Sequence, residues 1–240
     1  MNESISNTLD GTTAIVTGAS RGFGRGIAAA LSAAGVHVVG VSRTPGVQVT
    51  ADAADPATAS RLIDEHQPRT LVLCAGASPR MAALQEQTWE SFSQNWNVDV
   101  AQAFHWMRCA LLRPLVPGSL VIAISSGAAI NGSPLSGGYA GAKATVKFIA
   151  DYAAAESKRA GLGIRFVSVL PQLTPATDLG AAAAAAYAQR QGVDVDTFVQ
   201  SLSPSLTPEQ VGKAVLEIAA TEQPDHRAYK LTAAGLSPLG

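Results

Sequence analysis

Short runs of consecutive apolar residues alternate along this chain with longer stretches of helical spacing. Such runs are typical of strands in a parallel sheet, because helices cover both faces of that sheet. The pattern predicts strands at Thr13–Thr17, Val36–Val41, Val47–Ala51, Leu71–Ala75, Leu120–Ser125, Ile164–Leu170 and Ala228–Thr232. It predicts helices near Gly22–Ala34, Pro56–His66, Thr88–Leu112, Tyr139–Arg159, Ala181–Gln191 and Pro208–Thr221. This alternation predicts an α/β fold, a Rossmann-like, doubly wound parallel sheet with helices on both faces.

One connection departs from the alternation. Only Ser42–Gly46 separates the second and third predicted strands, where a parallel crossover normally takes about a dozen residues. Either a tight loop replaces the crossover helix or the third strand is misplaced.

Composition narrows the class of protein. The chain has 240 residues, 47% hydrophobic and 15% charged, which predicts one globular domain spanning 1–240. With a net charge of −1, the chain has no excess of positive charge for binding nucleic acid. Two cysteines are too few for a disulfide framework. The polar head Met1–Thr12 lacks the features of a signal peptide, and no run approaches the roughly 18 apolar residues of a membrane helix. We therefore expect a cytoplasmic protein without a membrane partner.

A glycine-rich turn follows the first predicted strand directly and opens a helix. Its sequence is Thr17-Gly-Ala-Ser-Arg-Gly-Phe-Gly24. Glycines allow a tight turn and let backbone N–H groups approach a ligand, and the helix start favours a phosphate. Gly18 is expected to make the turn, Gly22 the close approach and Gly24 the helix–strand packing. The sequence therefore predicts a nucleotide site here.

The same turn also contains Gly18-Ala-Ser20-Arg-Gly22, which matches the nucleophile elbow of α/β-hydrolases with Ser20 as nucleophile. That site needs an oxyanion-hole N–H from an earlier strand–helix loop, and only a short polar head precedes this strand. The hydrolase is therefore the weaker alternative.

Tyr139 and Lys143 are four residues apart at the start of a predicted helix, so they share one face of it. Together with the glycine-rich turn, Asn97 and Ser126, in this order, they resemble the motifs of the short-chain dehydrogenase/reductase family. The resemblance covers Gly11 to Thr232. It implies that Tyr139 is the catalytic acid/base, with Lys143 as its activator and Ser126, rather than Ser125, as the catalytic serine.

By the same resemblance, Asn97 supports a proton-relay water beside the lysine. The chemistry agrees with the family. Hydride transfer builds negative charge on a carbonyl oxygen, which a positioned acid must protonate. A phenol beside an ammonium suits this role, because the cation favours its ionised form.

The residues after the second strand indicate the cofactor. Enzymes that use NAD usually place an acid there, but this chain has Ser42-Arg43. Arg43 can instead bond a 2′-phosphate, and Arg21 is a second cation near it. We therefore predict NADPH rather than NADH. The scattered histidines lack ligand spacing, so no metal site is expected.

Three segments depart from the family pattern. Leu73-Cys-Ala-Gly76 replaces the usual Asn-Asn-Ala-Gly, Pro171-Gln172 replaces Pro-Gly, and the tail Leu231–Gly235 lacks Asp-Gly-Gly. Thr174 and Thr177 both lie where the family contacts the nicotinamide carboxamide. The predicted cofactor-binding positions are Gly18, Ser20, Arg21, Gly22, Phe23, Gly24, Ser42, Arg43, Asp52, Ala53, Ala75, Gly76, Tyr139, Lys143, Pro171 and Thr174.

These observations predict an NADPH-dependent reductase of a ketone or aldehyde, with a reaction that is reversible in principle and a small-molecule substrate. An enoyl reductase is disfavoured, because that relative spaces its tyrosine and lysine further apart. The alternative from another class is a cofactor-binding sensor or scaffold with little turnover. Leu173–Ser205 is expected to form a variable, largely apolar lid over the substrate. The family implies a homodimer or homotetramer through the helices near Ala101–Leu112 and Tyr139–Arg159.

Overall fold

A computed structural model describes residues 9–221 and 226–239. The first eight residues of the polar head Met1–Thr12, from which the expectation about a signal peptide is drawn, lie outside this part. All eight strands described join one sheet, in the order β3-β2-β1-β4-β5-β6-β7-β8, and only β8 is antiparallel. The strands are β1 (Thr13–Thr17), β2 (His37–Ser42), β3 (Val49–Thr50), β4 (Thr70–Leu73), β5 (Leu120–Ile124), β6 (Arg165–Pro171), β7 (Ala228–Thr232) and β8 (Gly235–Pro238).

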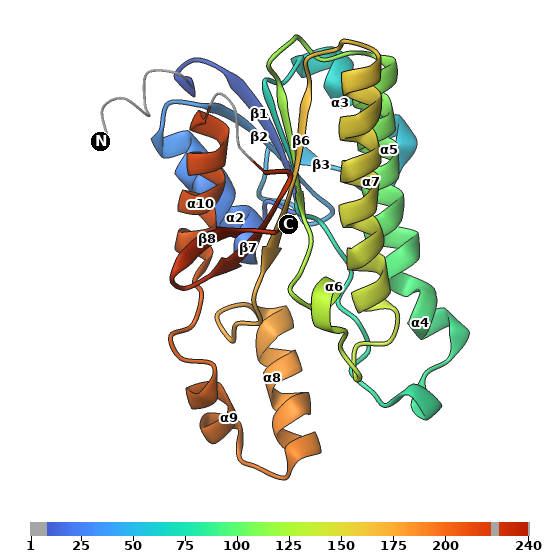
Figure 1. Ribbon diagram of the computed structural model, residues 1–240, viewed down its shortest axis with the longest axis vertical. Coiled ribbons are helices and arrows are strands. Elements are labelled where there is room, and N and C mark those ends of the chain that lie inside the picture. The colour runs from blue at the N-terminus through green and yellow to red at the C-terminus, as the bar shows by residue number, and fades with distance from the viewer. Residues whose placement is uncertain (1–8, 222–225, 240) are drawn as a thin grey trace.

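The helices described are α2 (Gly22–Ala33), α3 (Pro56–His66), η1 (Leu84–Glu86), α4 (Trp89–Asn95), η2 (Trp96–Val100), α5 (Ala101–Leu112), α6 (Ala128–Asn131), α7 (Tyr139–Arg159), α8 (Asp178–Gln191), α9 (Val195–Ser201) and α10 (Pro208–Ala220). Some of them form two layers, one on each face of the sheet (Figure 1). The pair α2 and α10 covers one face, and α3, α5 and α7 cover the other, each over its own apolar cluster. The predicted doubly wound α/β fold is therefore confirmed.

The seven predicted strands are all present, with bounds shifted by up to two residues. The doubtful third strand is real, although it is shortened to Val49–Thr50. It runs parallel to β2 and pairs only with Val41 and Ser42 at the end of that strand. Because the chain must return over only about two residues, roughly 7 Å, a short loop replaces the crossover helix.

The long helix predicted at Thr88–Leu112 is interrupted. It divides into α4, a π-helical turn η2 and α5, and the N–H of Ala101 bonds to the carbonyl of Trp96 across that turn. Such π turns are rare and are frequently found at functional sites. Here the turn lies beside α7.

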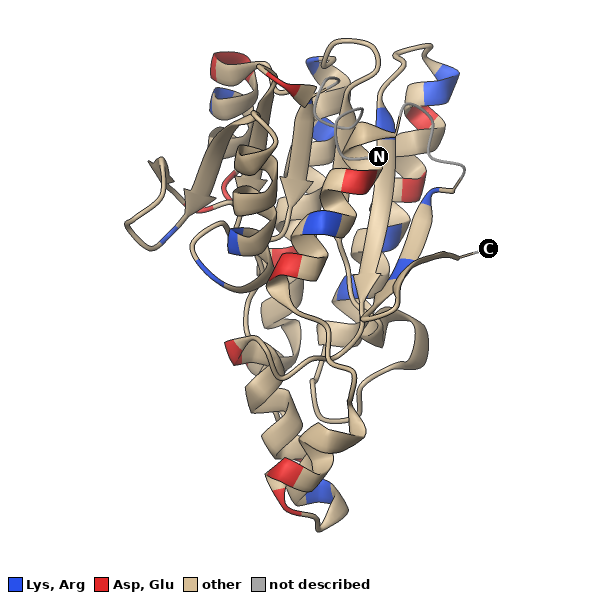
Figure 2. Cartoon of the chain, turned by 90° about the vertical axis from the view of Figure 1, so that its left-hand side faces the viewer, with Lys and Arg blue, Asp and Glu red and all other residues tan. Residues whose placement is uncertain are grey.

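The structure adds elements that the pattern did not predict: η1, α6, α9 and the final antiparallel strand β8. Each has seven residues or fewer, which is too short for a clear periodic signal. No helix in residues 9–221 and 226–239 is both long and apolar enough to cross a membrane. Positive and negative positions are interspersed over the face seen in Figure 2.

Candidate active site

The predicted functional positions follow the carboxyl ends of the strands. β1 ends at Thr17, β2 at Ser42 and β5 at Ile124. Parallel strands end at one edge of the sheet, so these segments gather there, around the point between β1 and β4 where the strand order reverses. In open α/β sheets this is where ligands bind.

The glycine-rich turn lies directly against the segment after β4. Gly18 has φ +69°, and a Cβ there would be 2.8 Å from the backbone of Ala75. A Cβ on Gly24 would be 2.1 Å from the carbonyl oxygen of Gly18, so a side chain would separate α2 from the turn. Ser42 donates a hydrogen bond to the hydroxyl of Ser20 (2.9 Å), which joins the turn to the end of β2.

The start of α2 is suited to an anion. Arg21 is its N-cap and gives no side-chain capping bond, and its first turn contains no acid. The free N–H groups and the helix dipole therefore remain available to a phosphate. Phe23, in the same turn, is half-buried and packs against the apolar cluster under α2.

The two cations predicted to bind a 2′-phosphate differ in their surroundings. Arg43 is exposed at the end of β2 and makes no hydrogen bond or ion pair with any other residue that the structure describes. Arg21 Nη1 lies 3.1 Å from Asp178 Oδ2 at the start of α8, and both side chains are exposed. Arg43 is thus free to meet a phosphate, whereas Arg21 already has a partner.

Tyr139 and Lys143 occupy the first turns of α7 and face each other, with Lys143 Nζ 5.7 Å from the centroid of the phenol ring. Tyr139 is half-buried, and its hydroxyl bonds to no other described residue. Lys143 is buried and donates to the carbonyl of Ile124 (3.1 Å). The phenol is therefore open to a ligand, while the ammonium beneath it is enclosed.

The two serines at the end of β5 have different environments. Ser125 is buried and donates to the carbonyl of Lys143 (2.8 Å), which fixes the strand to α7. Ser126 is half-buried, and its hydroxyl accepts a bond from the N–H of Ala128 (3.2 Å). The hydroxyl proton of Ser126 therefore remains available for a hydrogen bond to a ligand, which the role predicted for this serine requires.

The structure corrects the prediction that Asn97 supports a proton-relay water beside the lysine. Asn97 is exposed, and the side chain that contacts Lys143 is Asp99, with 3.0 Å between Nζ and Oδ1. Residues two apart on a helix do not face the same side, so Asn97 points away when Asp99 points inward. Burial opposes the charged ammonium, but Asp99 and Tyr139 favour it, and the net effect raises the pKa of Lys143.

Three buried polar residues that the sequence interpretation missed lie on this face: Asn95, Asp99 and Gln102. Their i, i+4, i+7 spacing was the available signal, because polar residues at helical spacing within a buried stripe need partners. Asp99 Oδ2 accepts a bond from the N–H of Ala77 (2.9 Å), and Asn95 donates to the Ala77 carbonyl (2.7 Å).

The segment that departs from Asn-Asn-Ala-Gly is held by side chains from other elements. Thr17 Oγ1 accepts bonds from the N–H groups of Cys74 (2.9 Å) and Ala75 (3.2 Å) and donates to Gln102 (2.5 Å). Gln102 in turn donates to the carbonyl of Ala75 (2.9 Å). The backbone at Ala75 and Gly76 is thus fixed without the family's asparagines.

The remaining predicted positions lie at the same edge. Asp52 is exposed, and its carboxylate accepts a hydrogen bond from the N–H of Ala54. The neighbouring Ala53 is buried. Pro171 is the last residue of β6. Thr174 is buried and donates to the carbonyl of Leu206 (2.5 Å). Thr177 caps α8 and lies beside Gly22. Of the two threonines, Thr177 therefore borders the glycine-rich turn.

The predicted lid takes the form of α8 and α9, which extend together beyond the sheet (Figure 1). Ala184, Ala188 and Phe198 form a small buried cluster, against which Tyr187 and Leu202 pack. Much of the lid's apolar character is thus used in packing α8 on α9. A hollow of about 460 Å³ lies where the lid meets the ends of β6 and β7, lined by Gln172, Leu173, Ser201, Leu202, Ser203, Pro204, Thr232, Ala233 and Ala234.

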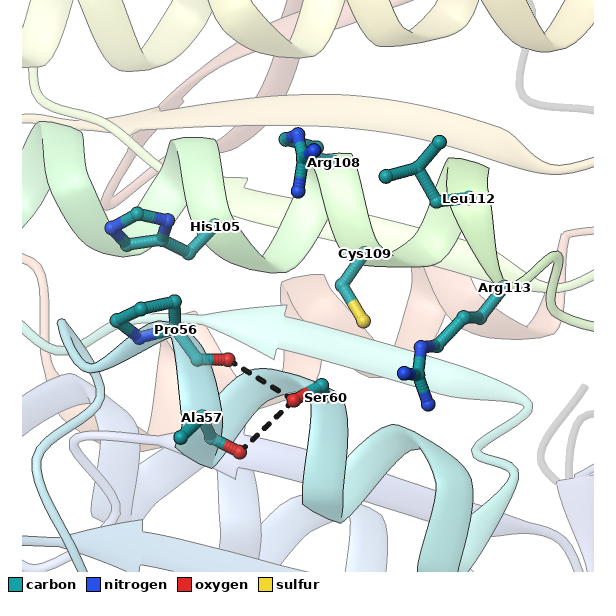
Figure 3. A pocket seen from close by; sticks show the side chains of 8 residues that line it. All are labelled: Pro56, Ala57, Ser60, His105, Arg108, Cys109, Leu112 and Arg113. Atoms are coloured by element: carbon teal, nitrogen blue, oxygen red, sulfur yellow. Dashed lines mark hydrogen bonds between the residues drawn. The ribbon is translucent and has the colours of Figure 1, made fainter.

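A second hollow, of about 350 Å³, lies between α3 and α5. Figure 3 shows its lining, which is Pro56, Ala57, Ser60, His105, Arg108, Cys109, Leu112 and Arg113. None of the predicted site residues borders it. It is therefore separate from the edge that carries the tyrosine and lysine.

Comparisons with known proteins identify the family. A family model described as enoyl-(acyl carrier protein) reductase matches residues 18–224. A short chain dehydrogenase/reductase, AacuD of Aspergillus aculeatus, is 32% identical over 67% of this chain and 63% of its own length. L-xylulose reductase of Mesocricetus auratus is 34% identical over 47% of this chain and 52% of its own. The chain belongs to the short-chain dehydrogenase/reductase family.

These relatives are matched over less than two-thirds of their own length. A solved short chain dehydrogenase from Burkholderia cenocepacia, in complex with NADP, has the same fold. Its TM-score is 0.74 at 24% identity, over 89% of this chain and 92% of that one. The chain accordingly has the Rossmann-like fold of this family.

Proposed function

We propose that this protein is an NADPH-dependent reductase of a ketone or aldehyde, with Tyr139 as the proton donor. The observation that carries the proposal is the pairing of a half-buried phenol, free of internal hydrogen bonds, with a buried ammonium 5.7 Å from its ring centroid. A cation in a site of low dielectric favours the negative charge that forms on the phenol as its proton leaves.

The chain's own residues divide the remaining work. The uncapped start of α2 and the turn Gly18–Gly24 fit a pyrophosphate, and Arg43 fits a 2′-phosphate. When bound, the nicotinamide supplies the hydride. Ser126 donates a hydrogen bond to the carbonyl oxygen, and Tyr139 transfers a proton to it as its charge develops.

A panel of ketones and aldehydes with NADPH tests this proposal, with cofactor oxidation as the measurement. Tyr139→Phe is expected to lower kcat about 10³-fold, because the acid is lost, while the variant still binds NADPH. Tyr152→Phe is the matched control, since that exposed tyrosine lies further along the same helix. Unchanged turnover in Tyr139→Phe would remove the proposed mechanism.

The same panel of compounds also tests two other functions. The matching family model is described as an enoyl reductase, so an α,β-unsaturated thioester belongs in the panel. The spacing of Tyr139 and Lys143 favours the carbonyl, as does the likeness to reductases of L-xylulose. A protein that binds NADPH and oxidises it with no compound of the panel would instead be a sensor or scaffold.

We also propose that two copies of the chain associate through α5 and α7. These helices pack side by side, and each carries large apolar side chains in contact with solvent: Phe104 and Leu112 on α5, and Phe148 on α7. Exposed apolar side chains gathered on neighbouring helices are typical of an interface.

A further inference from the structure

The ion pair between Asp99 and Lys143 is almost completely buried. Nζ and Oδ1 are 3.0 Å apart, and the exposed fractions of the side chains are 8% for Lys143 and 1% for Asp99. The other ionisable groups near this ammonium are the phenol of Tyr139, on the same helix, and the thiol of Cys74, after β4. Asp99 is therefore the one carboxylate, among described residues, that balances this charge.

The carboxylate is held in place independently of the lysine. Oδ2 accepts bonds from the N–H of Ala77 (2.9 Å) and from the amide of Asn95 (3.2 Å). On the other side, a Cβ on Gly76 would be 2.7 Å from Oδ1, so the glycine leaves room for the acid. Asp99 thus provides a fixed anchor, and the flexible lysine side chain adapts to it.

An isolated ammonium in such a position is unstable. Burial favours the neutral amine, and buried lysines without a partner lose their proton near neutral pH. A fixed carboxylate at hydrogen-bond distance reverses that preference. We propose that Asp99 is a positioning residue, the counter-ion that keeps Lys143 charged and directed toward Tyr139. This inference rests on the proposed function for its catalytic consequence.

Removing the charge of Asp99 has two routes to one result. If burial then makes Lys143 lose its proton at lower pH, activity falls as pH rises through that loss, because the phenol no longer has a cation to stabilise the charge left when it gives up its proton. If Lys143 stays charged without a counter-ion, its charge favours the ionised phenol more strongly, so the phenol loses its proton to solvent at lower pH. By either route the alkaline limb of carbonyl reduction moves to lower pH.

The first experiment compares pH profiles of kcat and of kcat/KM for the wild type, Asp99→Asn and Asp64→Asn. Asp64 is the control, because it pairs with Arg113 on the exposed surface. In Asp99→Asn the alkaline limb is expected to fall by about one pH unit or more, with the KM for NADPH within about threefold. A uniform loss of kcat at every pH, as from a merely structural role, would overturn the proposal.

The second experiment needs no turnover. In Asp99→Asn the lysine is expected to have a pKa below its unfolded value of about 10.4. At low pH the folded variant holds a buried charge without a partner, which lowers its free energy of unfolding. This destabilisation shrinks as pH rises toward 10.4 and the lysine of the folded protein loses its proton. The difference in Tm between wild type and Asp99→Asn should therefore narrow from neutral pH to about pH 10. A difference that stays constant would contradict the proposal.

This measurement separates the inference from the proposed function, since it holds for a protein that reduces no carbonyl. If Asp99→Asn does not fold, the double variant Asp99→Asn/Lys143→Met decides. Removing the unpaired charge should restore folding, because a buried ammonium without a partner destabilises the fold more than an uncharged side chain at the same position does. A double variant that is no more stable than the single one would overturn the proposal.

Discussion

The hydroxyl oxygens of Ser133 and Tyr187 lie 2.5 Å apart, and this contact joins the loop before α7 to the lid helix α8. The ring of Tyr187 also stacks on Phe198 of α9, with centroids 6.1 Å apart. One tyrosine therefore couples both lid helices to the segment that leads to Tyr139.

Tyr187→Phe should loosen the lid while keeping its packing. The loss of one hydrogen bond, about 1 kcal/mol, predicts a rise of about fivefold in the KM for the carbonyl. The Kd for NADPH should not change, because the contact lies on the lid. Steady-state kinetics measure the KM for the carbonyl, and cofactor titration measures the Kd for NADPH, with Tyr152→Phe as the control. An unchanged KM would mean that this contact does not shape the substrate site.

Arg43→Ala should abolish the preference for NADPH. A charge-assisted bond to phosphate is worth about 1.5–3 kcal/mol, so kcat/KM with NADPH should fall about 10- to 100-fold, while NADH turnover stays the same. Arg61→Ala, at an exposed arginine paired with Glu65, provides the control. An equal loss with both cofactors, or a wild type that prefers NADH, would refute the assignment.

Cys74 should react slowly with alkylating reagents. Burial raises the pKa of its thiol to about 11, an effect opposed by Lys143 and reinforced by Asp99. Since the thiolate is the nucleophile, the alkylation rate should rise about tenfold per pH unit up to about pH 11. Mass spectrometry of the native protein follows it, and Cys74→Ser isolates the contribution of Cys109. Rapid labelling near neutral pH would contradict the expectation.

The raised pKa of the Cys74 thiol also affects the stability of the fold. The folded state holds the thiol proton more tightly than the unfolded chain does, so the contribution of this group to the free energy of unfolding declines above the ordinary thiol pKa of 9.0 and through about 11. Chemical unfolding at several pH values should therefore show a smaller alkaline loss in Cys74→Ser than in the wild type.

Phe148→Glu should convert the proposed dimer to monomers. This phenylalanine on α7 is 51% exposed, and a charge placed in an apolar interface would be desolvated without a partner. Light scattering after size-exclusion chromatography gives the mass directly. Leu84→Glu alters an equally apolar exposed residue outside α5 and α7 and should leave the mass unchanged. A wild type that is already monomeric would refute the interface.

Much of the fold could be predicted from local patterns. The continuous apolar strands, the glycine-rich turn and the pair Tyr139–Lys143 depend on neighbours in the sequence, and each lies on the predicted element. A side chain four residues from another on a helix faces the same way whatever surrounds it. The sequence alone therefore determined the doubly wound sheet and the edge at which its site residues gather.

Tertiary structure decided which polar residue contacts Lys143. Asn97 and Asp99 are both polar residues of one predicted helix, and only the packing of η2 against α7 turns Asp99 inward and leaves Asn97 exposed. The partner of Arg21 is likewise 157 residues away in the chain. Contacts between such distant segments depend on how whole elements pack, and no local pattern of residues encodes that arrangement.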